Sequence, residues 1–137
     1  MSQAPRRAGA AAAEAGDSRS SSGTAPGPTP GTVYGGQEDW IDAVCQLGTF
    51  IDGRGTLPAA TGKGMCRAKS GMDYISIGQY DSDYKMRNDL VLTRENYYAS
   101  AIESDGTVMV LAVRGAPVEL QPLTQFGFTI NSVQKLR

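Results

Sequence analysis

The stretch YYASAIESDGTVMVLAV, from Tyr97 to Val113, decides the fold that we expect for this chain. It consists of two apolar runs, Tyr97–Glu103 and Thr107–Val113, separated by Ser104-Asp105-Gly106. Asp-Gly between two apolar runs is among the strongest short-range signals for a β-hairpin. The stretch therefore predicts two antiparallel strands joined by a short turn.

The sequence before the hairpin predicts another strand and then a helix. Met72–Tyr80 is typical of a buried strand, with its large apolar side chains at the centre. Asp81 and Ser82 are candidate N-caps of a helix that runs to about Arg94. A strand, a helix and a strand in succession predict a right-handed crossover between two parallel strands, to which the hairpin adds an antiparallel third.

Two more helices are expected on either side of this unit. The acidic pair Glu38-Asp39 suits the first turn of a helix, and apolar residues recur after it at helical spacing as far as Ile51. A short helix over Leu120–Phe126 ends at Gly127, and Phe128–Val133 returns to the core. The order α-β-α-β-β-α predicts an α+β domain with a small three-stranded mixed sheet and helices packed on it.

The predicted core takes its members from all of these elements. Val110 and Leu111 are neighbours in a strand, and neighbouring strand residues face opposite sides of a sheet. We therefore expect a sheet that is covered on both sides, or else one of these two side chains exposed. The residues expected to be mostly buried are Trp40, Val44, Leu47, Ile75, Ile77, Leu90, Val110, Leu111, Phe126 and Phe128.

The segment from Met1 to Gly36 differs in composition from the rest of the chain. It is mainly Ala, Gly, Ser, Pro and Thr, and its sizeable apolar side chains are Val33 and Tyr34. Such a segment cannot bury enough surface to offset about 1–2 kcal/mol of backbone entropy per residue. Residues 1–36 are therefore predicted to be a disordered tail or tether, with an unused leader as the alternative, and residues 37–137 a single folded domain.

Cys45 and Cys66 are the two cysteines of the chain, and they bracket the glycine-rich loop Asp52–Gly64. An even, minimal count in a small chain favours one structural disulfide, with two free thiols as the alternative. Disulfides persist in oxidising compartments, so the pair predicts an extracytoplasmic protein, secreted or anchored through a segment outside this sequence. A cytoplasmic regulatory domain with reduced cysteines is the alternative.

The composition narrows the chemistry that the domain can perform. The chain has no histidine, and with two cysteines we expect neither a metal site nor a cofactor. The net charge of −1 gives no basic footprint for nucleic acid, and no apolar run is long enough to span a membrane. We expect no enzymatic activity. The alternative is a small enzyme that uses carboxylates, with Asp73, Asp81 and Asp83 as the clustered candidates.

Two surfaces are candidate binding sites. The glycine-rich loop offers two basic side chains and an apolar tip, and loops held by a rigid scaffold are favoured recognition sites. The alternative is a spacer that only connects helix to strand. The second surface is a sheet face with two tyrosines, which offer large area and a polar tip unless they are half-buried core residues. The candidate binding residues are Arg54, Leu57, Pro58, Lys63, Tyr74 and Tyr98.

A set of segments between residues 37 and 133 follows an order found in a known type of domain. The segments are Trp40 with Cys45, Cys66 with Tyr74–Ile77, Tyr80-Asp81-Ser82, Asp89-Leu90, Tyr97-Tyr98-Ala99 and Leu123–Phe128. Behind a Ser/Thr/Pro/Gly tether, this arrangement resembles the small exported and lipoprotein-like domains of actinobacteria, mycobacteria especially. The resemblance implies an envelope location and a disulfide, although the chain has no lipobox cysteine near its start.

These features predict a non-enzymatic binding or scaffolding module of the cell envelope, tethered by a flexible linker. The expected partner is another envelope protein, and neither nucleic acid nor a cofactor is expected. We expect a monomer or a weak oligomer.

Overall fold

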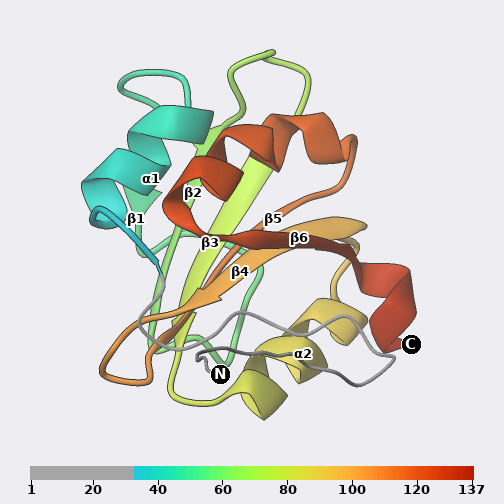
Figure 1. Ribbon diagram of the computed structural model, residues 1–137. Helices are drawn as coiled ribbons and strands as arrows, with labels where there is room; N and C mark the ends of the chain where they lie inside the picture. Colours follow the sequence, from blue (N-terminus) through green and yellow to red (C-terminus); the bar gives the residue numbers. More distant parts are fainter. Residues whose placement is uncertain (1–32) are drawn as a thin grey trace, which may run out of the picture.

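The computed structural model describes residues 33–137, which fold around a six-stranded antiparallel sheet (Figure 1). The strands lie in the order β1-β2-β3-β5-β4-β6, and every pair of neighbours is antiparallel. The strands are β1 (Ile51–Asp52), β2 (Gly62–Arg67), β3 (Tyr74–Tyr80), β4 (Tyr97–Ile102), β5 (Val108–Val113) and β6 (Thr129–Ser132).

Helices cover both faces of this sheet. The helix α1 (Gln37–Val44) and the 3₁₀ helix η1 (Pro117–Phe126) lie side by side on one face (Figure 1). The helix α2 (Asp83–Leu92) and the short 3₁₀ helix η2 (Val133–Leu136) lie on the other. The expected N-cap of α2 is confirmed, because the Ser82 hydroxyl accepts a hydrogen bond from a backbone N–H one turn into the helix.

The expectation of a small three-stranded mixed sheet is wrong. β5 lies between β3 and β4 and pairs with both, so that Val113 faces Ile75 on one side and Tyr97 on the other. The connection through α2 explains this spacing, since a helix about 10 Å wide spans two strand spacings of about 4.8 Å. β3 and β4 therefore run in the same direction without being neighbours, and the predicted β4–β5 hairpin is confirmed.

The strands that the sequence analysis missed carry weak local signals. β2, with the sequence GKGMCR, lies in a region expected to be mostly loop, and glycine is depleted in strands. Phe50 compensates, because its ring lies against Gly64, where any Cβ would collide with it. Aromatic cover of this kind stabilises a strand glycine. β6 lies within the predicted return to the core, Phe128–Val133, and becomes a strand by pairing with β4.

The core is divided by the sheet into two clusters, one on each face. On the α1 face, Trp40 packs edge-to-face against Phe128, with ring centroids 5.2 Å apart. Phe126 is only partly buried at the edge of this cluster. Val110 and Leu111 are neighbours in β5 and both are buried, which confirms that the sheet is covered on both sides. The predicted core residues that are buried are Trp40, Val44, Ile75, Ile77, Leu90, Val110, Leu111 and Phe128.

Leu47 was expected in the core, and that prediction is wrong, because its side chain is 96% exposed. The helical spacing on which the prediction depended ends at Val44. Cys45 takes extended backbone angles and forms a β-bridge with Ala68, so the chain leaves the helix axis there. The apolar stripe of the sequence thus continues past the end of the helix into a turn and a strand.

The disulfide between Cys45 and Cys66 is confirmed. Their Cα atoms are 5.7 Å apart, and both residues are buried. The bond joins the residue that ends α1 to β2, and so holds the end of this helix against the second strand of the sheet.

The beginning of the described chain is attached to the domain. Val33 packs against the core cluster on the α1 face. The Tyr34 N–H donates to the Phe126 carbonyl at 2.7 Å, and the Trp40 indole N–H donates to the Tyr34 carbonyl at 2.7 Å. Of the tail predicted over residues 1–36, the part from residue 1 to residue 32 lies outside the described residues.

Candidate functional site

The glycine-rich loop does not present the binding tip that its sequence predicts. Leu57 has no exposed surface and belongs to the core cluster on the α2 face, so the prediction of an apolar tip is wrong. Pro58 and Arg54 are exposed, and Lys63 is partly exposed on β2. The loop therefore has its charged residues at the surface and its leucine inside the protein.

Close packing and a buried carboxylate hold this loop in place. Leu57 lies over Gly78 of β3, where an added Cβ would come within 2.8 Å of the leucine side chain. The Asp89 Oδ2 atom of α2 accepts hydrogen bonds from the Ala59 N–H and the Tyr80 hydroxyl, each at 2.8 Å. Burial, followed by the bond to Asp89, raises the pKa of Tyr80. The loop is thus an anchored part of the fold.

The carboxylates proposed for catalysis are not brought together. Asp81 and Asp83 lie at the surface near the start of α2, where they pair with Lys85 and Arg87 of the same helix. Asp73 lies just before β3, and its carboxylate accepts backbone N–H groups of Tyr74 and Gly115. Asp81 and Asp83 therefore form surface ion pairs, whereas Asp73 accepts hydrogen bonds from the backbone, and the three do not form one site.

The two candidate tyrosines share one face of the sheet but differ in exposure. Tyr98 is buried under α2, and burial is the largest cause that raises its pKa. Tyr74 is half exposed, and the Arg67 guanidinium lies 4.8 Å from its ring centroid and donates to its hydroxyl at 2.8 Å. The prediction that Tyr98 forms part of a binding surface is wrong, and Tyr74 remains available.

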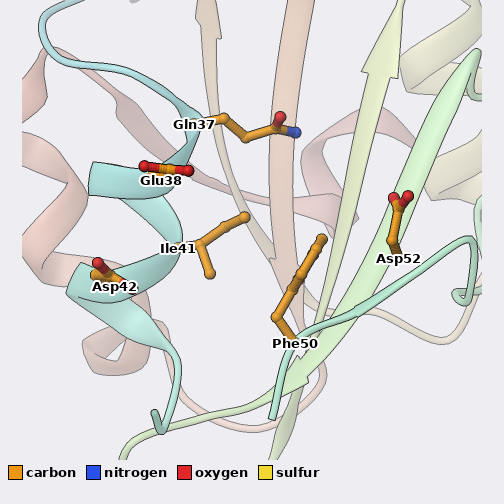
Figure 2. Close-up of a pocket in the computed structure, with 6 residues that line it drawn as sticks. All are labelled: Gln37, Glu38, Ile41, Asp42, Phe50 and Asp52. Atoms are coloured by element: carbon orange, nitrogen blue, oxygen red, sulfur yellow. The ribbon is translucent and has the colours of Figure 1, made fainter. Parts of the chain in front are cut away.

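A pocket of about 540 Å³ lies between α1 and β1, on the α1 face of the sheet. Figure 2 shows Ile41 of α1 and Phe50 pointing toward one another, with Gln37 and Asp52 on opposite sides above them. Phe50 is held there by its contact with Gly64. We call this the acidic pocket; its lining residues are Gln37, Glu38, Ile41, Asp42, Phe50 and Asp52.

The lining of the acidic pocket carries charge of one sign. Three of its residues are acidic, Glu38, Asp42 and Asp52, and none is basic. Glu38 and Asp42 come from consecutive turns of α1, a spacing that the sequence could have revealed. Asp52 comes from β1, which the sequence analysis did not predict. The pocket therefore combines an apolar floor with a negative rim.

A second pocket, of about 290 Å³, lies on the opposite face of the sheet, where β3 begins and β5 ends. Glu95 is 5% exposed and lies beside Ser76, whose hydroxyl hydrogen-bonds to its carboxyl. We call this the Glu95 pocket; its lining residues are Thr56, Met65, Met72, Asp73, Tyr74, Ser76, Glu95 and Arg114.

The electrostatics of the Glu95 pocket are set by burial. Desolvation is the largest cause that raises the pKa of Glu95, and the negative charge of Asp73 acts in the same direction. The hydrogen bond from Ser76 and the positive charge of Arg114 oppose this shift. Glu95 follows α2 within Arg94-Glu95-Asn96, which has no feature in the sequence that marks one of its members as buried.

Neither a metal cluster nor a membrane-spanning helix is found in the described part of the chain. Within residues 33–137, no group of three or more His, Cys, Asp or Glu side chains could hold a metal ion. None of the helices in the same range is long and apolar enough to cross a membrane.

Comparisons with known proteins were made by sequence and by structure. No family model, curated protein or solved structure matches this chain. The two pockets, the disulfide and the charges around them therefore carry the functional interpretation.

Proposed function

We propose that this chain is a non-catalytic binding domain that works outside the cytoplasm. In this proposal the acidic pocket takes a basic, partly apolar segment of another protein. One observation carries it: the lining combines the apolar side chains of Ile41 and Phe50 with three carboxylates, and no lining residue is basic.

The floor and the rim of the pocket support different aspects of binding. Removing apolar surface from water stabilises a complex by about 25 cal/mol per Å² before the cost of association. Exposed ion pairs contribute only about 0–1 kcal/mol each, but they steer a partner of opposite charge and select against one of like charge. A segment with lysine or arginine on both sides of an apolar residue meets both requirements.

Two features support a location outside the cytoplasm. The buried disulfide between Cys45 and Cys66 is of a kind that persists in oxidising compartments. The resemblance of residues 37–133 to small exported domains of actinobacteria points to the cell envelope. In this proposal the partner is another envelope protein, and the tether that the composition predicts is the segment before Val33, where the chain joins the domain.

The test is a titration of the isotope-labelled full chain with two peptides, followed by NMR. The peptides are acetyl-KLKLK-amide and its acidic counterpart acetyl-ELELE-amide. We expect the amide signals of Ile41, Phe50 and Asp52 to shift with the lysine peptide alone. Equal shifts with both peptides, or no shift at these residues, would overturn the proposal.

Two variants distinguish binding of the peptide at the pocket from attraction of the peptide by the net charge of the protein. Replacing two carboxylates together, Asp42→Asn with Asp52→Asn, should weaken binding of the lysine peptide by about three- to tenfold. Asp105→Asn, in the turn between β4 and β5, removes one exposed carboxylate far along the chain from the pocket and should change little. Equal weakening by both would show that the peptide senses only net charge.

A further inference from the structure

We propose that the Glu95 pocket binds a small zwitterion, an α-amino acid with an apolar side chain. The proposal is independent of the acidic pocket, because it concerns other residues on the opposite face of the sheet. Its basis is the joint presence of a buried carboxyl, an exposed guanidinium and apolar walls around one cavity.

The carboxyl of Glu95 has fewer partners than its burial requires. It is 95% removed from solvent, and the side-chain hydrogen bond that it receives comes from the neutral hydroxyl of Ser76. Among residues 33–137, no lysine or arginine forms an ion pair with it within 4.0 Å. A buried carboxylate is costly unless a charged partner compensates it. An ammonium group in the cavity would supply that charge and several donors.

Arg114 supplies the opposite charge on the same cavity. Its side chain is exposed and lines the pocket, and within the described residues no carboxylate pairs with it. Its positive charge nevertheless acts on Glu95. A ligand with an amine alone would be repelled by this guanidinium, and a ligand with a carboxylate alone would be repelled by Glu95 and Asp73. A molecule that carries both groups satisfies both sides.

The remaining walls and the volume set the class of side chain. Met65, Met72 and the half-exposed ring of Tyr74 form an apolar part of the lining, next to the hydroxyls of Thr56 and Ser76. A volume of about 290 Å³ corresponds to roughly ten water molecules at about 30 Å³ each. This space suits a single small amino acid with an aliphatic side chain, whereas a folded partner could not enter.

The test compares three probes that share the isobutyl group of leucine, at pH about 8, where Glu95 is more fully ionised than at lower pH. L-Leucine carries both charges, isoamylamine lacks the carboxylate, and 4-methylpentanoate lacks the amine. Each is titrated into the labelled full chain to millimolar concentration. We expect leucine alone to shift the amides of Ser76, Glu95 and Gly115. Equal binding of leucine and either single-charge probe would overturn the proposal, as would no response to leucine.

Variants test whether leucine binding depends on the charges of Glu95 and Arg114. Glu95→Gln keeps the shape of the side chain, and Arg114→Gln changes an exposed residue that is not part of the core. Each should weaken leucine binding by at least about tenfold, as expected for the loss of a charged hydrogen-bond partner. Arg54→Gln, at an exposed arginine that lines neither pocket, is the matched control. If Glu95→Gln fails to fold, Arg114→Gln still decides, and leucine binding unchanged in Arg114→Gln contradicts the proposal.

Discussion

Asp89 is the residue at which a loop, a strand and a helix of the α2 face are joined. Its side chain is buried, and one oxygen accepts hydrogen bonds from the Ala59 backbone and the Tyr80 hydroxyl, each at 2.8 Å. Hydrogen bonds to an ionised carboxylate are stronger than those between neutral groups. The side chain of this aspartate therefore contributes to three elements at once.

Removing one donor from this carboxylate should be costly. We expect Tyr80→Phe to lower the free energy of unfolding by about 1.5–3 kcal/mol, because a buried bond to a charged group is lost without a replacement. Urea unfolding measures the change. Tyr84→Phe, at a tyrosine that is 77% exposed, is the control and should stay within about 0.5 kcal/mol of the parent chain. Equal stability of Tyr80→Phe and the parent would show that water already replaces this bond.

Glu95 makes the stability of the domain depend on pH. Its pKa in the folded chain lies above the ordinary value of 4.5, chiefly because of burial. Between these two values the native chain keeps a proton that the unfolded chain has lost, so this contribution to stability falls as the pH rises. It is complete below about pH 4.5 and is lost once the pH passes the native pKa.

Glu95→Gln should remove this dependence, since the amide does not ionise. The free energy of unfolding of the variant, minus that of the parent chain, should therefore increase from about pH 4 to about pH 8. Urea unfolding at both values checks the sign. Val118→Ala, at an exposed side chain that does not ionise, is the control and should differ from the parent chain by the same free energy at both pH values. If the free energies of unfolding of Glu95→Gln and the parent differed by the same amount at both pH values, the burial argument would be contradicted.

At the scale of elements, the loop before β2 is part of the core. Leu57→Ala should lower the free energy of unfolding by about 2–5 kcal/mol, because it empties a fully buried site above Gly78. Pro58→Ala, at the exposed neighbouring residue, is the matched control. Thermal or urea unfolding measures both. If Leu57→Ala cost no more than its control, the loop would be the simple spacer that its composition suggests.

The elements that could be predicted from the sequence are those with local signals. The β4–β5 hairpin follows from Asp105-Gly106, α2 from its Ser82 cap, and the end of η1 from Gly127, which has a φ of 97°. β2 could not be predicted, because Gly64 becomes acceptable through the ring of Phe50, a contact made in three dimensions. Local patterns indicate elements but not which strands become neighbours.

For the candidate sites too, the sequence predicts local features but not the contacts made in three dimensions. Arg54 and Lys63 were predicted to be at the surface of their loop and are at least partly exposed there, but the leucine between them is buried. The Glu95 pocket was missed because the predicted β4–β5 hairpin brings Glu95 near Arg114, but Met65, Asp73 and Ser76 complete the cavity only after β5 inserts beside β3. A buried charge has no signature in composition or periodicity.

For the whole molecule, the disulfide connects α1 covalently to the sheet. Closing a loop of 21 residues is worth about 3 kcal/mol in the chain-entropy model, so Cys45→Ser with Cys66→Ser should cost about 2–4 kcal/mol. Unfolding in urea measures the loss, with intact mass under non-reducing conditions to verify the parent bond. A parent mass that corresponds to two free thiols would remove the basis of this prediction and of the proposed location.

The position of Cys45 also determines how the domain bears mechanical load. Tension applied at Val33 first breaks the bonds of Tyr34 and then unwinds α1, which releases the chain only as far as Cys45. The freed segment from Val33 to Cys45 reaches roughly 40 Å when fully extended, at about 3.5 Å per residue. Beyond it the force passes through the sulfur atoms to Cys66, inside a strand paired on both sides. A pull on the amino-terminal end therefore acts first on α1, which lines the acidic pocket, whereas the Glu95 pocket lies on the opposite face of the sheet and beyond the disulfide.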